Sequence, residues 1–321
     1  MFIRSPQFAG TFYPDNPQIL KEMIEDFLHQ ATVEKLKVQP KALIVPHAGY
    51  IYSAQVAAYG FKILEDKLFR AKREKRFCRA ERDRFLFRAK REKRFCRAER
   101  DRFLFRAKRE KRFCRSASWR RGRFLYKKII LLGPSHHFSF QGLASSPAGY
   151  WETPLGKITC LGKKDLKELK KTKEIIESSE IHEPEHCLEV EIPFLQTVLK
   201  EFKIVCFLTG ELNTKAIAKV LGSLVDEETL ILVSSDLSHY YSYEEAQKLD
   251  KVTIDAILDN DIKRLEEFGE ACGKTGIEVL MEIAKNKHWQ PKLLKALNSG
   301  DITGDKSQVV GYSSIVYYDS N

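Results

Sequence analysis

The sequence predicts an α/β fold with a largely parallel central sheet, and two features of the chain indicate it. Short apolar runs that suit strands buried on both faces alternate with longer segments whose apolar residues recur at helical spacing. Such alternation is typical of sheets whose parallel strands are joined by helices. The chain has 321 residues, of which 43% are hydrophobic, and this is enough to bury a large core.

The expected elements follow one another along the chain. Asn16 to Gln30 has apolar residues at helical spacing, and Ala42 to Val45 is an apolar run that stops at a proline, so a helix and then a buried strand are expected. In the helical segment 189–201, Pro193 must lie near the start of the helix or kink it. The other expected helices are 53–65, 214–225, 243–258, 261–268 and 274–286, and the other expected strands are 129–132, 203–208, 230–233 and 309–318.

A basic internal repeat interrupts this pattern. The segment from Phe69 to Leu86 recurs unchanged at 87–104, and a third copy breaks off after Arg115. Residues 70–123 carry 25 Lys and Arg against 7 Asp and Glu, whereas the remaining residues carry 30 against 37. The net charge of +11 therefore arises from this segment alone. We predict one domain over 1–321 in which 69–126 is a helical, looped or disordered insertion, because connecting loops accept long insertions at little entropic cost.

Composition limits the function classes. No apolar stretch reaches the ~18 residues of a membrane span, and the N-terminal residues lack the apolar core of a secretion signal, so a cytoplasmic protein without a membrane partner is expected. The seven cysteines show no paired metal spacing and are interpreted as reduced thiols. The insert is either functionally neutral or an arm that binds polyanions, so nucleic acid is an expected partner only if the insert is functional.

Histidines follow three of the predicted strands. His47, His136 and His239 each lie just past the end of an apolar run, with Asp236 beside one of them. Ligands of open α/β sheets bind outside the carboxyl ends of the strands. A lone histidine is more often a structural hydrogen-bonding residue, but imidazole is also a good ligand for iron, copper or zinc. Three histidines in the same topological position therefore predict a small polar, metal-binding site.

Two further residues could belong to this site. His186 lies in the segment Glu183 to Glu189, which is either a helix start with acids in its first turn or the source of a base or a substrate contact. Cys272 precedes a predicted helix, where a thiolate would be stabilised, so it is either a soft metal ligand, a reactive thiol or a small buried residue.

Several short motifs occur in a fixed order. They are Pro46-His47-Ala48-Gly49-Tyr50, Gly133-Pro134-Ser135-His136-His137, Thr153-Pro154-Leu155-Gly156, Glu185-His186-Cys187-Leu188-Glu189, Ser234-Ser235-Asp236-Leu237-Ser238-His239 and Cys272-Gly273. With them the chain resembles the Memo family, known in prokaryotes as AmmeMemoRadiSam system protein B, over nearly everything outside the insert. The resemblance implies a three-layer sandwich with a mostly parallel or mixed sheet, similar to class III extradiol dioxygenases, which hold iron(II) with two histidines and a glutamate.

The resemblance also implies roles for individual residues. His47 and His136 would be metal ligands, with Cys272 in place of the glutamate. His239 would handle protons and Asp236 would line the site. Apart from the resemblance, the segment Glu183 to Glu189 makes His186 a third catalytic candidate. A thiolate makes the site softer, so the expected cofactor is iron(II) or copper. For the same reason, the ring-cleaving reaction of the dioxygenases is less well supported for this chain.

Two functions of different classes follow from these patterns. The first is a metal-dependent redox enzyme in which His239 acts as acid and base. The second is a non-catalytic module whose cleft binds a small molecule or a peptide. The family name links such a module to a radical-SAM protein and a companion protein of a modification system.

Overall fold

The structure is a computed structural model, and it describes residues 2–34, 38–65, 126–162, 165–166, 169 and 172–319. All of these except Glu65 belong to one compact unit, formed by Met1–Leu64 and Tyr126–Asn321. The predicted insert 69–126 lies outside the described residues except for Tyr126, which is buried and donates a hydrogen bond to Pro40 O. Among the described residues, no helix combines the length and the apolar character that a membrane crossing requires.

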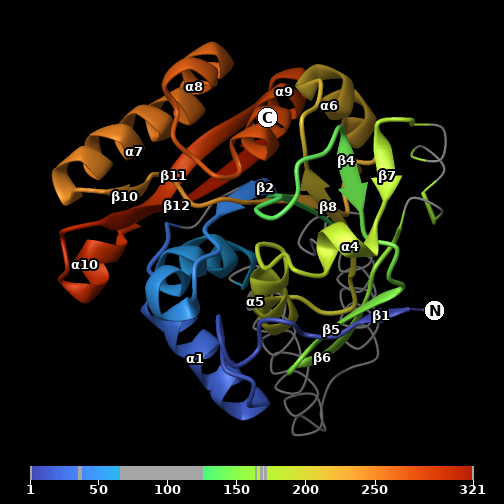
Figure 1. Cartoon of the computed structure of the whole chain (residues 1–321), viewed down its shortest axis with the longest axis horizontal. Coiled ribbons are helices and arrows are strands. Elements are labelled where there is room, and N and C mark those ends of the chain that lie inside the picture. The colour runs from blue at the N-terminus through green and yellow to red at the C-terminus, as the bar shows by residue number, and fades with distance from the viewer. Residues whose placement is uncertain are drawn as a thin grey trace, which may run out of the picture. The chain divides into compact units, whose positions relative to one another are not determined.

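A mixed sheet forms the middle of the described unit (Figure 1). Its centre consists of four parallel strands in the spatial order β2 (Pro40–Val45), β9 (Thr229–Ser234), β3 (Lys128–Pro134) and β8 (Lys203–Thr209). Beyond β2 lies β12 (Val309–Asp319), which is antiparallel to it and also pairs with β10 (His239–Tyr241) and β11 (Trp289–Asn298). Beyond β8 lie β4 (Leu143–Ser145) and β7 (Ile175–Glu177). The prediction of a mostly parallel or mixed sheet is therefore confirmed.

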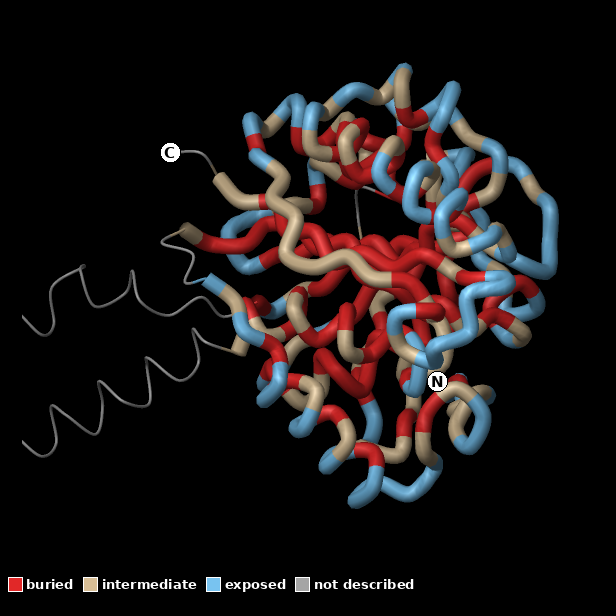
Figure 2. Tube along the Cα trace, turned by 90° about the vertical axis from the view of Figure 1, so that its left-hand side faces the viewer, coloured by how far each residue is buried: buried red, intermediate tan, exposed pale blue. Residues whose placement is uncertain are grey.

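Helices cover both faces of this sheet. Along β2, Leu43 and Val45 belong to one core, whereas Ala42 and Ile44 belong to the other, because successive side chains of a strand point to opposite faces. The first core contains side chains of α1 (Pro17–Gln30), a helix over 50–65 and α5 (Ile192–Val198). The second contains those of α6 (Thr214–Ser223), α7 (Tyr243–Leu258), α8 (Ile262–Phe268) and α9 (Lys274–Lys287). Figure 2 shows the buried residues as a band between two outer layers, as expected for a three-layer sandwich.

Local sequence signals set several helix ends. The Asn16 side chain accepts hydrogen bonds from Gln18 N and Ile19 N at the start of α1. The expected helix over 189–201 is divided into a 3-10 turn, Glu189–Glu191, and α5. Pro193 lies in the first turn of α5, where the missing N–H leaves no helical hydrogen bond unmade.

A second sheet has three strands. It consists of β1 (Ile3–Arg4), β5 (Tyr150–Thr153) and β6 (Gly156–Thr159), with β1 parallel to β5. The short helices α4 (Ser179–His182) and α10 (Ser299–Thr303) complete the named elements of the described residues. Because β1 carries Arg4, this small sheet fixes the segment 2–13 that packs beside the functional residues.

Gly142 gives a test of the packing beside β4. Its φ is +89°, and a Cβ atom would lie 2.0 Å from Glu174 O. Gly142→Ala is expected to lower the free energy of unfolding by roughly 2–5 kcal/mol, since left-handed strain and a backbone clash add. Gly304 is the matched control, with φ +83° and no atom within 4 Å of a Cβ. Gly304→Ala should cost only about 1–2 kcal/mol in urea unfolding. Equal losses in the two variants would contradict this account.

Candidate metal centre

Three adjacent parallel strands deliver polar residues to one edge of the sheet. His47, Asp236 and His136 each lie two residues beyond the last residue of β2, β9 and β3 respectively. These strands are neighbours in the order β2, β9, β3. Since neighbouring strands are about 4.8 Å apart, side chains at their ends can meet. The predicted convergence of His47 and His136 is found in the structure.

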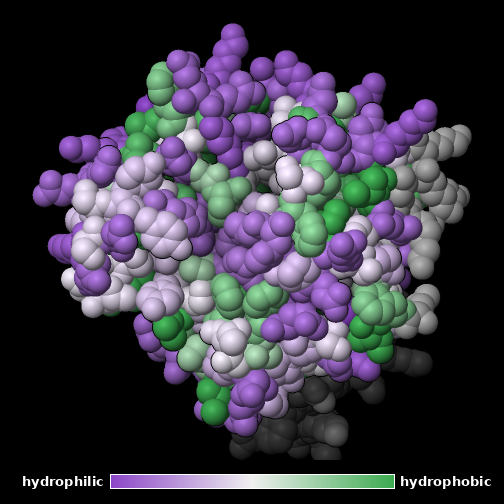
Figure 3. All heavy atoms as spheres, in the orientation of Figure 1, coloured by the Kyte–Doolittle hydropathy of each residue, from purple (hydrophilic) through white to green (hydrophobic). Residues whose placement is uncertain are grey.

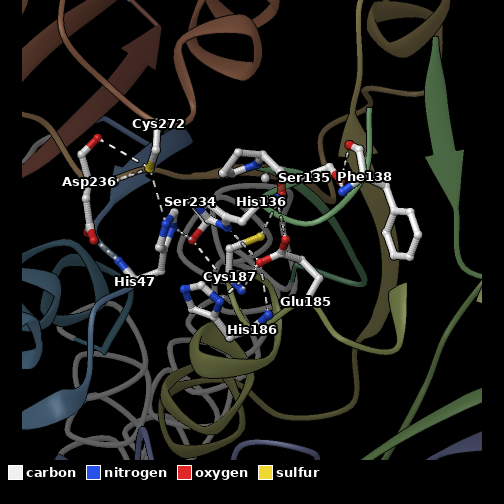
Figure 4. Close-up of polar contacts among 12 residues, drawn as sticks. His47, Ser135, His136, Phe138, Glu185, His186, Cys187, Ser234, Asp236 and Cys272 are labelled. Atoms are coloured by element: carbon white, nitrogen blue, oxygen red, sulfur yellow. Dashed lines mark hydrogen bonds and ion pairs between the residues drawn. The ribbon is translucent and has the colours of Figure 1, made fainter. Parts of the chain in front are cut away.

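Three imidazole rings form a nearly equilateral triangle at this edge (Figure 4). Ring centroids are 5.3 Å apart for His47 and His136, 5.4 Å for His47 and His186, and 4.9 Å for His136 and His186. One ring nitrogen from each residue lies within 4.8 Å of the other two. The structure thus adds His186, predicted only as a catalytic candidate, to the two predicted ligands.

The Glu185 carboxylate orients two of these rings. It accepts hydrogen bonds from His136 N at 2.7 Å and from His136 Nδ1 at 2.9 Å, and its Oε1 lies 3.2 Å from His186 Nδ1. It also accepts from the backbone N–H groups of His186 and Cys187. Because both Nδ1 atoms face this carboxylate, Nε2 of each ring remains available to a metal.

His47 is oriented from the other side of the triangle. Its Nδ1 lies 2.9 Å from Ser234 Oγ, and its Nε2 lies 3.3 Å from Cys272 Sγ. All three histidines thus have Nδ1 occupied by a polar partner, the arrangement usual for metal-binding histidines. Figure 4 shows Cys272 above His47 and on the side away from Glu185.

The spacing of these side chains fits a transition metal ion. Three imidazoles bound to one tetrahedral ion have centroids roughly 5 Å apart, and an imidazole nitrogen and a thiolate sulfur on such an ion lie roughly 3.5 Å apart. The observed 4.9–5.4 Å and 3.3 Å are close to these values. The donors are soft or borderline, which suits iron, copper or zinc better than magnesium or calcium.

The pKa values of two of the three rings favour the neutral imidazole, which is the form that binds a metal ion. Burial and then repulsion from His136 lower the pKa of His47 to about 3, and burial and repulsion from His47 lower the pKa of His186 to about 3. Burial would also lower the pKa of His136, but the hydrogen bond and charge of Glu185 outweigh it and raise the pKa. His47 and His186 are therefore neutral near pH 7, and only His136 holds its proton more firmly.

Hydrogen bonds of Asp236 connect the turn after β9 with the turn after β2 and with Cys272. The Asp236 carboxylate accepts from His47 N at 2.8 Å, while Asp236 N donates to Cys272 Sγ at 3.2 Å. Burial, and then the charge of Asp236, raise the pKa of the Cys272 thiol well above its usual range. The thiol is therefore protonated in the metal-free protein, and a metal would have to displace that proton. Burial also raises the pKa of Asp236 to about 6.

His239 is not part of the triangle. It begins β10 and is half-buried, and it is not among the histidines whose nitrogens lie within 4.8 Å of one another in the described residues. Its charge adds to the lowering that burial causes in the pKa of His47, and it opposes the rise that burial causes in the pKa of Asp236. The proton-handling role of His239 stays a prediction, as does the assignment of Cys272 as third ligand.

Sequence reasoning missed the groups that orient the ligands. Glu185 belongs to the segment that was expected to supply a base or a substrate contact, but it was not singled out. No role was predicted for Ser234, the last residue of β9. Sequence reasoning also missed the aromatic support of His186, whose ring lies 4.4 Å from that of Phe12 and 5.7 Å from that of Phe8. The adjacency of Glu185 to a candidate histidine was the available signal.

Comparison with known proteins identifies the family of the chain. The Memo-like protein family matches residues 4–73 and 121–316, so the chain belongs to that family. A MEMO1 family protein of Thermoplasma volcanium is 29% identical over 98% of each chain, and one of Saccharolobus islandicus is 31% identical over 96% of this chain and 97% of the relative. The structure of an uncharacterized protein, JW3007, from Escherichia coli K12 has 10% identity and a TM-score of 0.39, covering 60% of this chain and 87% of that one.

Glu185→Gln tests whether the carboxylate orients the rings. Burial would raise the pKa of Glu185, but the hydrogen bonds and charge of His136 outweigh it and lower the pKa to about 2, so the carboxylate is ionised. A glutamine has one acceptor oxygen fewer and no charge. We expect metal affinity to fall roughly 10–100-fold, measured by competition with a chelator. Glu183→Gln, a neighbouring and less buried acid, is the control, and an equal loss in both variants would contradict the assignment.

Asp250 in α7 holds the loop that leads to His239. Its Oδ1 accepts from Ser238 N at 3.0 Å, and its carboxyl group is only 8% exposed. Burial raises the pKa of Asp250 to about 6, although the Ser238 N–H opposes this. The folded state therefore holds the proton more tightly than the unfolded state, and between about pH 4 and pH 6 stability falls as the pH rises.

Asp250→Asn should remove this pH dependence. The contribution is roughly 3 kcal/mol, from a shift of about two pKa units at ~1.4 kcal/mol each. The difference in unfolding free energy between wild type and variant should change by about this amount between pH 4 and pH 7 in urea titrations. Glu245→Gln, at an exposed position of the same helix, should show no such change. A pH-independent difference for Asp250→Asn would show that the carboxyl group is not the source.

Proposed function

We propose that this chain binds one iron or copper ion at the sheet edge and uses it for redox chemistry. The observation that carries the proposal is the triangle of His47, His136 and His186, each ring held at Nδ1 by a buried polar partner. A bound iron or copper ion would supply one-electron redox chemistry. The membership in the Memo-like family is consistent with a shared site but does not specify its chemistry.

His47 and His136 are the ligands on which the proposal depends. Both are predicted from sequence and both belong to the triangle. His186 offers a third nitrogen, and Cys272 offers a sulfur beside His47. We assign the thiolate to the ion together with His47 and His136, because the Asp236 N–H that points at Cys272 Sγ would stabilise a thiolate after metal binding.

The remaining residues of the site would bind and move protons. Asp236 fixes the turn that carries His47, since its carboxylate accepts from the His47 N–H. His239, half-buried at the start of β10, can accept a proton on an imidazole nitrogen and return it. The rings of Phe8 and Phe12 pack against that of His186 and support its orientation.

Oxygen uptake by the loaded protein tests the proposal. The purified chain is loaded anaerobically with iron(II) or copper(I), freed of excess metal, and supplied with a reductant and oxygen. Wild type should take up oxygen faster than the metal-free protein, and His47→Ala should neither retain the ion nor take up oxygen. His239→Gln should retain the ion but slow the uptake. Uptake by loaded wild type no faster than by His47→Ala would overturn the proposal.

Recognition of a peptide at the same site is a second candidate function, favoured by exposed apolar side chains near these histidines in the sequence. Ile51, Tyr52, Phe138 and Tyr240 are 66%, 39%, 38% and 70% exposed, and they follow His47, His136 and His239 in sequence. On the face of the molecule that Figure 3 shows, hydrophilic side chains lie in the middle and hydrophobic ones lie on several sides of them. A partner such as a radical-SAM protein or its companion could dock there. Partner binding that survives Tyr240→Ser and His136→Ala unchanged would contradict this second function.

A further inference from the structure

Three buried polar atoms lie within hydrogen-bonding distance of Ser234 Oγ. It lies 2.9 Å from His47 Nδ1, 2.7 Å from Cys187 O and 2.7 Å from Glu191 Oε1. Ser234 and Cys187 are completely buried, and His47 and Glu191 are each 1% exposed. Because the group is closed to solvent, each of the three contacts needs a hydrogen of its own from these residues.

Counting hydrogens leaves one arrangement. A carbonyl only accepts, so the single Ser234 hydroxyl hydrogen must point at Cys187 O. The other two contacts must then be filled by hydrogens from His47 Nδ1 and from a protonated Glu191, both donated to Ser234 Oγ. If the Ser234 hydrogen pointed at Glu191 or at His47, two oxygen atoms 2.7 Å apart would face each other without a hydrogen between them.

We propose that Glu191, as a neutral carboxylic acid, and Ser234 are positioning residues that hold His47 in its Nδ1–H tautomer, with the Nε2 lone pair directed into the site. The value of this tautomer rests on the proposed metal-binding function, but its existence does not. Two further observations agree with it. Burial raises the pKa of Glu191 well above its usual range. Cys272 Sγ lies 3.3 Å from His47 Nε2, and an Nε2 lone pair can accept the hydrogen of a thiol at this position.

One segment of the chain provides hydrogen-bond partners for all three histidine rings, either directly or through Ser234. The segment 185–191 orients His136 and His186 through the Glu185 carboxylate and orients His47 through Glu191 and Ser234. A single stretch of seven residues thus sets the direction of all three rings. This explains why Glu191, in the 3-10 turn Glu189–Glu191, is buried without a cationic partner among the described residues that contact it.

The nitrogen chemical shifts of the metal-free protein test the tautomer directly. Long-range ¹H–¹⁵N correlation spectra distinguish a protonated from an unprotonated ring nitrogen, and the His47 signals are identified by their loss in His47→Gln. Wild type should show His47 protonated at Nδ1 and not at Nε2. Glu191→Gln should preserve this pattern, because the side-chain amide can donate to Ser234 Oγ as the acid does. Glu191→Leu and Ser234→Ala should give a mixture of tautomers or the other one.

Metal titration supplies the second readout. Cobalt(II), a coloured stand-in for iron(II), should bind Ser234→Ala roughly 10–100-fold more weakly than wild type, and Glu191→Gln should bind it like wild type. Ser313→Ala is the matched control: Ser313 is also fully buried, and its Oγ has no hydrogen-bond partner in the described residues. Thermal unfolding shows which variants are folded.

Different outcomes separate this inference from the metal proposal. His47 protonated at Nε2 in wild type, or a tautomer lost in Glu191→Gln as in Glu191→Leu, overturns the inference whatever metal binds. Failure of wild type to bind cobalt(II), iron(II) or copper(I), with the Nδ1–H tautomer present, overturns the proposed function and leaves the positioning role intact.

Discussion

Arg4→Met is expected to lower the free energy of unfolding by about 3–5 kcal/mol, because it leaves the Glu189 carboxylate buried without its cation. Arg4 is 4% exposed and Glu189 is completely buried, and the two form an ion pair. Glu189 also accepts from Phe8 N at 2.9 Å and from Tyr13 Oη at 2.6 Å. Without Arg4 these neutral donors would face an uncompensated charge.

The guanidinium does more than balance this charge. It donates to the carbonyl oxygens of His182, Glu183 and Glu185, and it lies 4.2 Å from the centroid of the Trp151 ring. Methionine fills similar space but satisfies none of these acceptors. Since the carbonyl of Glu185 belongs to the segment that orients the histidines, metal affinity should fall together with stability.

Lys127→Met is the control for the ion pair. Lys127 and Glu228 form a pair at 2.8 Å whose side chains are 62% and 50% exposed. A pair of that kind contributes about 0–1 kcal/mol. Urea unfolding of both variants measures the contrast. A loss below about 1 kcal/mol for Arg4→Met would show that the buried pair does not hold the segment 2–13 in place.

His136→Ala is expected to weaken metal binding by more than about 100-fold, and His47→Ala likewise. Loss of an outer partner alone costs roughly 10–100-fold, and loss of a ligand should cost more. Iron(II) or copper(I) affinity, measured anaerobically by competition with a chelator of known strength, gives the numbers. Retention of wild-type affinity in either variant would remove that histidine from the ligand set.

Cys272→Ser and His186→Ala decide the third ligand. If Cys272 is the ligand, its replacement should resemble His136→Ala, and His186→Ala should cause a smaller loss. If the three histidines alone hold the ion, the order should be reversed. Cys160→Ala controls for removal of a buried thiol, because Cys160 belongs to the core and is 2% exposed.

The central strands of the fold could be predicted because they are buried on both faces. Runs such as Ala42 to Val45 are apolar at every position, which distinguishes them from the amphipathic helices. β11 was not predicted, because β12 is its one partner within the described part of the chain, its residues are mostly half-buried, and it contains Pro291. Proline is tolerated in such a strand, but a proline in the sequence argues against predicting a strand there.

Only the site residues that directly follow a central strand could be predicted from the sequence. His47 and His136 follow apolar runs, so topology alone brings them together. The contact of Glu185 with His136 joins residues 49 positions apart, and that of Ser234 with Glu191 joins residues 43 apart. No periodicity links such pairs, and a serine after a strand is usually interpreted as part of a turn. The orienting groups therefore became visible only when the chain was folded.

The most direct test of the metal centre is the X-ray absorption spectrum of the anaerobically loaded wild-type chain, at the edge of the iron or copper that it binds. We expect imidazole nitrogens at roughly 2.0–2.1 Å and one sulfur at roughly 2.3 Å from the ion, as in protein zinc sites. The sulfur should be absent in Cys272→Ser, and His47→Ala should not load. A spectrum with oxygen ligands only, or equal metal content in wild type and His47→Ala, would contradict the proposed metal centre.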